Sequence, residues 1–536
     1  MRIFIFALIM MLAPISIEAK DIPKTVRPYG GTLVWGTYTR PTIINPILTT
    51  HSVSMSLLDL IFNRLVRLNT KGEIEPDLAE SWDISADGLV YTFYLRKGVK
   101  FHDGVECTAF DVKFTYDRII DPQNNSPFAP FFKLVQDFQV IDKYTFRLTL
   151  RQPSAPFIYR LVREIVPKHI LEGADLKTCS FNWHPVGSGP FRFKEWNKDD
   201  QIILEYNPDY YEGRPYLDEI ILKSYPDSQS LWIAFMRGEA DFVGFIERED
   251  YEILKDDPAF KVYSIPFDYY YALLYNTNDP ILADKIVREA IAYGIDRKNL
   301  IERVAGGYGL ECIGPFSPES LGFNPLVKPF EYNPQKAQVL LAQAGWQDED
   351  NDGILEKAGE KLEIRVLVDA RRDILKRIIM VLRQQLQEIG IKIKVILYDD
   401  EDMLINEDFL QRNKPQAHLK FPLAAVGIDP DRTEEEWRSG FVMTAKVWQC
   451  NLEAIDRLFT LGKVTQDNQE RKKIYQNIHK IIYENQLVCF LYFPFCFFAV
   501  SQKFENAESF FTINMPIYTM KDWYLDSQMG TDKRRR

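Results

Sequence analysis

The acidic segment DEDNDG (residues 348–353) is the part of the sequence whose residue types and spacing best fit an ion-binding site. Asp348, Asp350 and Asp352 followed by a glycine match the start of a calcium loop, in which alternate positions supply oxygen ligands. The twelfth position of such a loop should carry a glutamate that binds through both oxygens, but here it is Gly359. We therefore predict a solvated turn between a helix and a strand, and no metal site.

Catalytic chemistry finds little support in the sequence. No histidine lies in an HExxH or other paired-ligand spacing, so each is expected to be a surface or satisfied core residue: His51, His102, His169, His184, His418 and His479. There is no GxSxG elbow and no GxGxxG after a strand, and GSGPF (187–191) lacks the lysine of a phosphate loop. Asp429 and Asp431 in GIDPD could form an acid/base pair, but a capped loop is the favoured interpretation. We predict that the protein is not an enzyme and needs no cofactor.

Tyrosines are concentrated in FDYYYALLYN (residues 267–276), in a chain that is 13% aromatic. A tyrosine has a flat apolar surface with a polar tip, which suits a cleft that grips a ligand without reacting with it. Alternatively, successive residues of this strand pack into two adjoining cores, because side chains alternate along an extended chain. Both interpretations remain open from the sequence, and Tyr270 and Tyr271 are the candidate ligand contacts.

The size and charge of the chain exclude some classes of protein. At 536 residues it is too long for one core, and roughly 100 to 200 residues per domain suggests about three domains. The net charge of -11 disfavours a nucleic-acid partner, because phosphate binding draws on clustered Lys and Arg. The basic cluster KRRR (533–536) is expected to be a solvated tail.

The N-terminus predicts export. MRIFIFALIMMLAPISIEA has Arg2 before an apolar run and Ala19 as a small residue for cleavage, so residues 1–19 are interpreted as a signal peptide. No cysteine follows the run to accept a lipid, which predicts a soluble product, periplasmic in a bacterium with two membranes. The cysteines contain no CxxC and are expected to be mainly buried thiols with one bridge at most: Cys107, Cys179, Cys312, Cys450, Cys489 and Cys496.

The elements that would position these residues follow a mixed pattern. GTLVWGTY (31–38) predicts a strand, residues 52–68 an amphipathic helix, and residues 80–104 a hairpin that turns at Asp87-Gly88. Thr108 is a predicted helix N-cap with Asp111 three residues on. The second half alternates helices and strands, and CFLYFPFCFFAV (489–500) predicts a buried strand because it is too short to span a bilayer. The fold class is therefore α/β.

A family resemblance rests on several segments in order along the chain. DLAESWDISADGLVYTFYLRKGVKFHDG from Asp77 is followed by TAFDVKFTYDRI, VGSGPFRFKEW (186–196), a long segment at 275–309, AGWQDEDNDGILEKAGEKLEI (344–364) and a final one at 469–492. Together they resemble the family 5 extracellular solute-binding proteins, the peptide- and nickel-type binding components of ABC importers. The resemblance implies a bilobed periplasmic-binding-protein fold, type II-like, with an additional domain. By analogy lobe I comprises 20–47, 186–275 and 499–536, the extra domain 48–185 and lobe II 276–498, with a hinge near Tyr275 and Val500.

The resemblance also implies a function. Such a protein is expected to be a monomer that closes its lobes on a ligand and delivers it to a membrane permease. Oligopeptides or dipeptides are the expected ligands; the alternatives are a nickel chelate, haem, an opine or an oligosaccharide. Two hypotheses from other functional classes are an exported hydrolase and a protein that only docks on partners.

The ligand-binding pattern of the family is altered here. Peptide binders carry an Asp four residues before the proline of the acidic loop, where this chain has Val426, so Asp429 could take over the amine-binding role if the loop is shifted. Arg40 stands where many peptide binders have Glu, which suggests a cleft that tolerates an anionic group. The candidate ligand contacts are Tyr38, Arg40, Tyr270, Tyr271 and Asp429.

Overall fold

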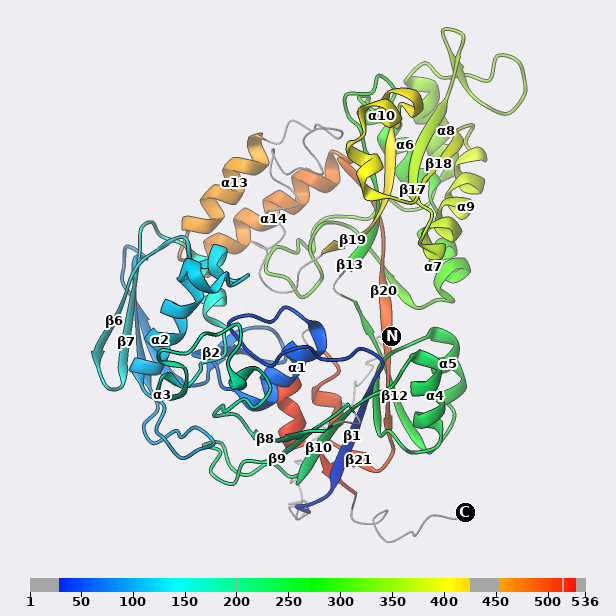
Figure 1. Cartoon of the computed structure of the whole chain (residues 1–536). Coiled ribbons are helices and arrows are strands. Elements are labelled where there is room, and N and C mark those ends of the chain that lie inside the picture. Colours follow the sequence, from blue (N-terminus) through cyan, green and yellow to red (C-terminus); the bar gives the residue numbers. More distant parts are fainter. Residues whose placement is uncertain (1–27, 198–199, 268, 425–452, 513–514, 527–536) are drawn as a thin grey trace, which may run out of the picture.

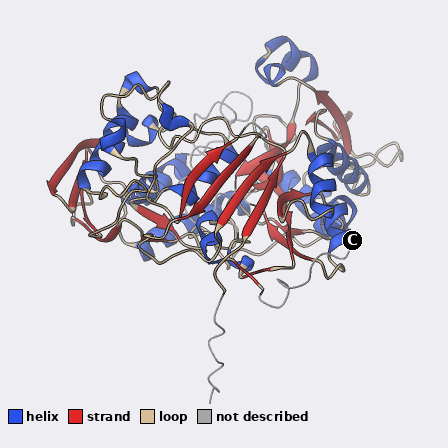
Figure 2. Cartoon of the chain, turned by 60° about the horizontal axis from the view of Figure 1, so that its bottom comes forward, coloured by secondary structure: helices blue, strands red, loops and turns tan. Residues whose placement is uncertain are grey.

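The computed structural model describes residues 28–197, 200–267, 269–424, 453–512 and 515–526. The predicted signal peptide, Cys450, the basic tail and the candidate contact Asp429 lie outside the described residues. The chain forms two lobes and an extra domain of helices and strands (Figure 1), as the sequence predicts. Seen from below, the strands gather in the middle of the molecule with helices around them (Figure 2).

One long strand connects the two lobes. Strand β20 (Val488–Ser501) has 14 residues and is buried along almost its whole length. Its beginning pairs with β13 (Tyr269–Tyr275), whereas its end pairs with β11 (Phe242–Ile246) and with β12 (Phe260–Pro266). The prediction of a buried strand at 489–500 is confirmed. Because β20 has neighbours in both halves, the strands of the two lobes form a single 12-stranded sheet.

The first lobe is built around strand β1 (Thr32–Thr37). This strand is parallel to β11 and to β10 (Glu219–Ser224), and β9 (Gln201–Tyr206) and β8 (Phe191–Trp196) extend the sheet in antiparallel fashion. Helices α4 (Ser228–Met236) and α5 (Arg248–Leu254) complete this lobe. The carboxyl ends of β1 and β11 consequently meet at one edge.

The second lobe contains three parallel neighbours in the order β18 (Lys392–Tyr398), β17 (Glu363–Asp369) and β19 (Ala417–Ala424). Strand β14 (Gly309–Glu311) pairs with β20. The principal helices are α6 (Lys285–Gly294), α7 (Arg297–Ala305), α8 (Pro334–Gln343), α9 (Asp373–Gln387), α10 (Glu407–Asn413), α13 (Glu453–Val464) and α14 (Asn468–Glu484). None of the described helices is long and apolar enough to cross a membrane.

The extra domain has a four-stranded antiparallel sheet. Its order is β4 (Ala79–Ile84), β5 (Val90–Leu95), β7 (Thr145–Leu150) and β6 (Val135–Asp142), and α2 (Ala109–Ile120) packs on β6 and β7. The short helix α3 (Lys168–Leu171) also belongs to it. The predicted hairpin and the predicted start of a helix after Thr108 are both confirmed, and the Asp111 carboxylate accepts the Thr108 N–H at 2.8 Å.

The helix predicted over residues 52–68 is too long. Helix α1 covers Ser52–Ile61, and the chain then turns into strand β2 (Val66–Leu68), which pairs with β3 (Ile74–Pro76). The reason is tertiary: the Arg64 N–H donates to the Asp77 carboxylate at 2.7 Å, and the Arg64 guanidinium donates to Glu164. Such contacts override a continuous apolar spacing, because helix propensity is only a weak preference.

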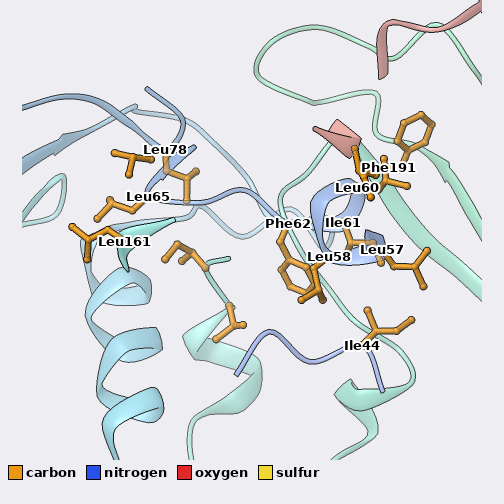
Figure 3. Close-up of a cluster of buried hydrophobic side chains, with 14 of the residues drawn as sticks. Ile44, Leu57, Leu58, Leu60, Ile61, Phe62, Leu65, Leu78, Leu161 and Phe191 are labelled. Atoms are coloured by element: carbon orange, nitrogen blue, oxygen red, sulfur yellow. The ribbon is translucent and has the colours of Figure 1, made fainter. Parts of the chain in front are cut away.

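A single apolar core runs through the first lobe and the extra domain. It includes Leu33 and Phe242 of the first lobe as well as Tyr91 and Phe146 of the extra domain. Figure 3 shows the part around α1, where Leu60 lies beside Phe191 of β8 and Leu57, Leu58 and Ile61 belong to the same cluster. The second lobe has cores of its own. The first lobe and the extra domain are thus packed as one body.

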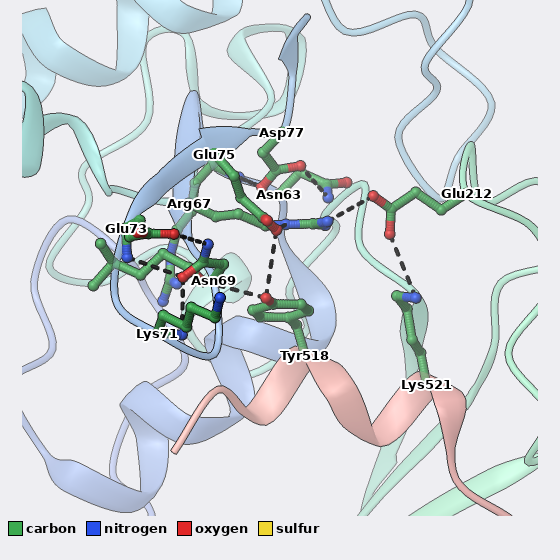
Figure 4. A network of polar contacts seen from close by, with 12 residues as sticks. Asn63, Arg67, Asn69, Lys71, Glu73, Glu75, Asp77, Glu212, Tyr518 and Lys521 are labelled. Atoms are coloured by element: carbon green, nitrogen blue, oxygen red, sulfur yellow. Dashed lines mark hydrogen bonds and ion pairs between the residues drawn. The ribbon is translucent and has the colours of Figure 1, made fainter. Parts of the chain in front are cut away.

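Charged side chains reinforce this junction (Figure 4). The Arg67 guanidinium lies between Glu75, at 2.7 Å, and Glu212, at 2.8 Å, and Lys521 approaches Glu212 at 3.5 Å. Tyr518 donates its hydroxyl to the Leu68 carbonyl at 3.2 Å. The network therefore joins the extra domain to two distant segments of the first lobe.

Two further predictions can be placed on this fold. Among the described residues, Cys107, Cys312, Cys489 and Cys496 are buried free thiols, as expected, while Cys179 is a half-buried free thiol. The domain boundaries remain a prediction: β13, placed in lobe I by analogy, pairs with β19 and with the second-lobe end of β20.

Candidate functional site

The carboxyl ends of β17, β18 and β19 meet at one edge of the second lobe. Parallel strands end together, and in open α/β sheets ligands bind outside these ends. Asp369 ends β17 and Tyr398 ends β18, while β19 ends at Ala424 and leads into residues 425–452, which contain the candidate Asp429. This edge is therefore the first place to seek a binding site.

Two arginines follow directly after β17. Arg371 donates from Nε to Oδ1 of Asp369 at 2.9 Å and from Nη2 to Oδ2 at 2.8 Å, and Arg372 Nε lies 3.5 Å from the same Oδ2. The hydrogen bonds from Arg371 lower the pKa of Asp369, which is therefore ionised at neutral pH. The arginine side chains are 47% and 43% exposed, against 6% for the aspartate. A buried carboxylate thus orients two accessible guanidinium groups.

Helix α9 adds to the positive potential at this edge, because it begins at Asp373 and directs its N-terminal N–H groups toward the same region. Asp373 itself pairs with Lys376 at 2.5 Å. Two guanidinium groups beside a helix N-terminus form a favourable site for a carboxylate or phosphate group.

Tyr271 lies behind the arginines. The centroid of its ring is 4.8 Å from that of Tyr492, so this ring contact connects β13 with β20. Burial raises the pKa of Tyr271 to about 12, and the nearby cations Arg372 and Arg377 act in the opposite direction. The predicted contact Tyr271 is therefore close to the arginine edge, although only 5% of it is exposed.

Tyr270 points the other way. It is fully buried against Phe490, at 5.3 Å between ring centroids, and Phe493, at 5.9 Å. Tyr270 and Leu274 lie in one core of the second lobe, whereas Tyr271 and Leu273 lie in another. The interpretation that this strand alternates between two adjoining cores is confirmed. In this arrangement Tyr270 presents no surface to a ligand, and its role as a contact remains a prediction.

The first lobe presents its own edge, at the carboxyl ends of β1 and β11. Tyr38 follows β1 and is 51% exposed, and Arg40 forms an ion pair with Asp200 at 2.8 Å with 70% of its side chain exposed. These two predicted contacts are accessible on the same edge as Phe245 of β11. Arg40 has a partner, so its charge is partly balanced.

Phe245 is the residue of this edge that sequence reasoning missed. It lies at a bulge of β11 with φ +56°, a left-handed conformation that bulky residues rarely adopt, and its ring is 54% exposed. Its ring centroid is 5.2 Å from Phe498 and 6.0 Å from Phe267, which in turn contacts Tyr269 at 4.8 Å. Stored strain of this kind clusters at functional sites. The aromatic row also follows the connection from β12 to β13 that joins the lobes.

The lobes also touch through α5. Tyr308 of the second lobe donates its hydroxyl to Glu252, and its ring lies 5.4 Å from Tyr251 and 5.2 Å from Phe497. The Arg248 hydrogen bond lowers the pKa of Glu249, with a smaller contribution from Arg377 of α9. Helices α5 and α9, from different lobes, therefore lie near each other at the junction.

A lysine outside the acidic segment 348–353 supplies a positive charge to it. Lys361 Nζ contacts Asp350 and Glu356, each at 3.0 Å, and also Asp352. These hydrogen bonds raise the pKa of Lys361 and keep it charged. Asp348, Asp350 and Glu356 have oxygens within 4.8 Å of one another, yet the ammonium group supplies the positive charge beside them. The segment is the predicted exposed turn.

Three of the histidines are satisfied in the interior. His102 accepts the Gly187 N–H at 3.2 Å, and burial lowers its pKa to about 4. His418 contacts the Tyr398 hydroxyl at 3.0 Å, and burial lowers its pKa to about 3. His479 accepts the Asn324 N–H at 2.9 Å. These residues have structural roles, as the sequence predicts.

Comparison with known protein families decides the class. The sequence matches the bacterial extracellular solute-binding proteins, family 5 (middle), over residues 73–440. This protein belongs to that family. The family is one of exported proteins that bind solutes, and the bilobed fold described above is the one its solved members share.

Three relatives illustrate the similarity. The oligopeptide-binding protein AppA of Bacillus subtilis is 30% identical over 508 residues, 92% of each chain. Its structure with a nonapeptide has a TM-score of 0.67 and 29% identity, covering 94% of this family 5 chain and 100% of the solved AppA chain. CtaP of Listeria monocytogenes gives a TM-score of 0.79 with 26% identity over 93% of this chain and 99% of CtaP. Heme-binding protein A of Haemophilus influenzae is 33% identical over 342 residues, 59% of this chain and 62% of that protein.

Proposed function

We propose that this protein is the periplasmic binding component of an ABC importer and that its ligand is a peptide. The observation that carries the proposal is the pair of exposed arginines that Asp369 holds at the carboxyl end of β17. A guanidinium group binds a carboxylate through two parallel hydrogen bonds, so Arg371 and Arg372 suit the free carboxylate of a peptide.

The first lobe would hold the body of the ligand. Exposed Phe245 and Tyr38 offer aromatic surfaces that contact side chains of any sequence, which a general peptide binder requires. The peptide's ammonium group needs a negatively charged hydrogen-bond acceptor, and Asp429 is our candidate because Val426 cannot provide one. AppA, solved with a nonapeptide, supports a peptide ligand by similarity.

Binding would proceed by closure of the lobes. The first lobe and the extra domain share one core and move as a unit, while the second lobe is joined to them through β20 and the connection from β12 to β13. A ligand that contacts Arg371 on one lobe and Phe245 on the other stabilises the closed arrangement. The closed complex would then deliver its ligand to a permease in the inner membrane, after export directed by residues 1–19.

A non-peptide anion is the second candidate. The same two guanidinium groups and aromatic surfaces would accept the carboxylates and flat ring of a haem, and a relative is named a heme-binding protein. Both candidates place an anionic group at Arg371 and Arg372, so they differ in what the first lobe holds.

Native mass spectrometry of the protein purified gently from a periplasm would separate the candidates. A family of bound masses that fragment as peptides supports peptide uptake. A single non-peptide mass overturns the peptide assignment, and an absorption band of a porphyrin in the same sample would identify haem.

A further inference from the structure

Several hydrogen bonds fix the turn between β4 and β5 in the extra domain. Gly88 donates its N–H to the Ser85 carbonyl at 2.8 Å, and Ser85 donates its own to Val90 at 2.9 Å. The Asp87 carboxylate accepts the Ser85 hydroxyl at 2.5 Å and the Leu89 N–H at 3.0 Å. These bonds close the turn on itself and leave Gly88 at φ +70°.

A residue of the second lobe packs directly on Gly88. A Cβ atom at this position would lie 2.5 Å from Nε2 of Gln466, 2.9 Å from its Cδ and 3.2 Å from Cβ of Pro153. Gln466 belongs to the connection between α13 and α14. Its Nε2 is buried and has no hydrogen-bond partner among the described residues, so the contact with Gly88 is one of shape.

The connection that carries Gln466 is itself held firmly. Arg471 is 4% exposed and donates from Nε to the Gly462 carbonyl at 3.2 Å, which ties the beginning of α14 to the end of α13. A Cβ at Gly462 would lie 2.7 Å from the Tyr475 hydroxyl, so the two helices pack closely. The two closely packed helices therefore fix the position of the connection that contains Gln466.

The extra domain offers a matching surface around the turn. Helix α13 contacts the 3-10 helix at Ala155–Leu161, and Tyr91 donates its hydroxyl to the Ser154 carbonyl at 2.9 Å. Burial raises the pKa of Tyr91 to about 12. The positive charge of Arg471, a residue of the second lobe, has a smaller and opposite effect on this pKa. The lower ends of α13 and α14 reach the extra domain at a place distinct from the crossing of β13 and β20 (Figure 1).

We propose that the β4–β5 turn is a latch, in which Gly88 receives Gln466 and fastens the second lobe to the extra domain at a point separate from the hinge strands. A lobe held at two separate points can rotate only about an axis through both, or by releasing one of them. The extra domain thereby limits how the second lobe moves. This inference does not depend on which ligand the protein binds.

The chain contains a matched control. Gly98, in the same domain, has φ +77° but an added Cβ would meet nothing within 4 Å. Gly88→Ala and Gly98→Ala therefore impose similar backbone strain, and only the first intrudes on Gln466. Gln466→Ala removes the contact from the other side without touching the turn.

Hydrogen–deuterium exchange of the ligand-free protein over residues 464–470 would test the latch. We expect exchange about tenfold faster in Gly88→Ala and in Gln466→Ala, no change in Gly98→Ala, and no further increase when the first two are combined. Small-angle scattering should show a wider distribution of dimensions in the same two variants. Parent-like exchange in Gln466→Ala, or an equal increase in Gly98→Ala, would overturn the latch. Because no ligand is added, neither result bears on the proposed function.

Discussion

Asp369 holds Arg371 through two parallel hydrogen bonds, of 2.9 and 2.8 Å, at the end of strand β17. The side chain of Asp369 is 6% exposed and that of Arg371 is 47% exposed, so a buried carboxylate fixes the orientation of a guanidinium group that reaches solvent. The binding hypothesis depends on this relationship.

Replacing either arginine should weaken binding of the peptide recovered with the protein. A hydrogen bond to a charged group contributes roughly 1.5 to 3 kcal/mol, so we expect Arg371→Ala or Arg372→Ala to raise Kd about 10- to 100-fold. Isothermal titration calorimetry measures this directly. Arg383→Ala is the control, because Arg383 is an exposed arginine further along α9. Equal effects at all three positions would point to a general loss of positive potential and against a defined site.

Removing the orienting carboxylate should act through the arginines. In Asp369→Asn the amide cannot accept two charged hydrogen bonds, so the arginines lose their orientation and peptide affinity should fall about tenfold. The lowered pKa of Asp369 also means that its contribution to stability is present above its ordinary value of 3.8 and is lost as pH falls below it. In thermal unfolding between about pH 2 and 7, the difference in Tm between parent and variant should therefore be constant above pH 3.8 and narrow below it. A constant difference in Tm across that range would contradict the assignment.

Phe245→Gly should separate binding from stability. Glycine adopts φ +56° without strain, so the substitution should leave Tm unchanged or raise it, while the loss of an exposed ring weakens ligand binding. Phe110→Gly is the contrasting variant: Phe110 is also exposed but lies in helix α2, where glycine destabilises by about 1 kcal/mol. A lower Tm in Phe245→Gly would show that the ring is needed for packing instead.

Protonation of His102 should lower stability in mild acid. Burial depresses its pKa from 6.5 to about 4, with a smaller lowering by Arg192 and opposing effects of the Gly189 carbonyl and Asp103. The folded state therefore binds fewer protons than the unfolded state, and stability falls as pH decreases from about 6.5 to 4. His102→Gln should flatten the dependence of Tm on pH in this window. An unchanged slope would assign the acid sensitivity to other groups.

Lys361→Met should convert the acidic turn into a cation-dependent one. Without the ammonium group, Asp350, Asp352 and Glu356 repel one another, so Tm should fall at low salt and recover when millimolar calcium is added. The parent should show no such response. A calcium-dependent rise in the Tm of the parent would mean that the ion displaces Lys361 and that the turn is a calcium site after all.

The sequence was informative where one periodicity or one motif dominates locally. The apolar run before Val500 predicts β20, Asp87-Gly88 predicts the hairpin turn, and Thr108 with Asp111 predicts the start of α2. Prediction failed where distant residues decide. Helix α1 ends early because the Asp77 carboxylate accepts a hydrogen bond from the Arg64 N–H just after it. No local sequence pattern shows this contact.

The candidate site could be outlined only in part from the sequence. Tyr38 and Arg40 lie at and just after the predicted strand at 31–38, and Arg40 was singled out by the family resemblance; their role as ligand contacts remains a prediction. Phe245 was missed because its exposure comes from a bulge in its pairing with β20, some 250 residues away in the chain. Arg371 and Arg372 follow LEIRVLVD (362–369), an apolar segment typical of a strand, and the rule that ligands bind at the ends of parallel strands could have indicated them. What was lacking was knowledge that β17 has parallel neighbours.

The position of β20 near the end of the chain has a consequence for export. Strands β11 and β13, though synthesised long before, each need β20 as a neighbour, so neither half of the central sheet is complete until residue 501 of 536 is available. During translocation nearly the whole polypeptide must therefore emerge before the sheet can close. The joining of the two lobes through the central sheet is therefore a late step in the folding of this chain, whereas the sheet of the extra domain contains no strand from the C-terminal part.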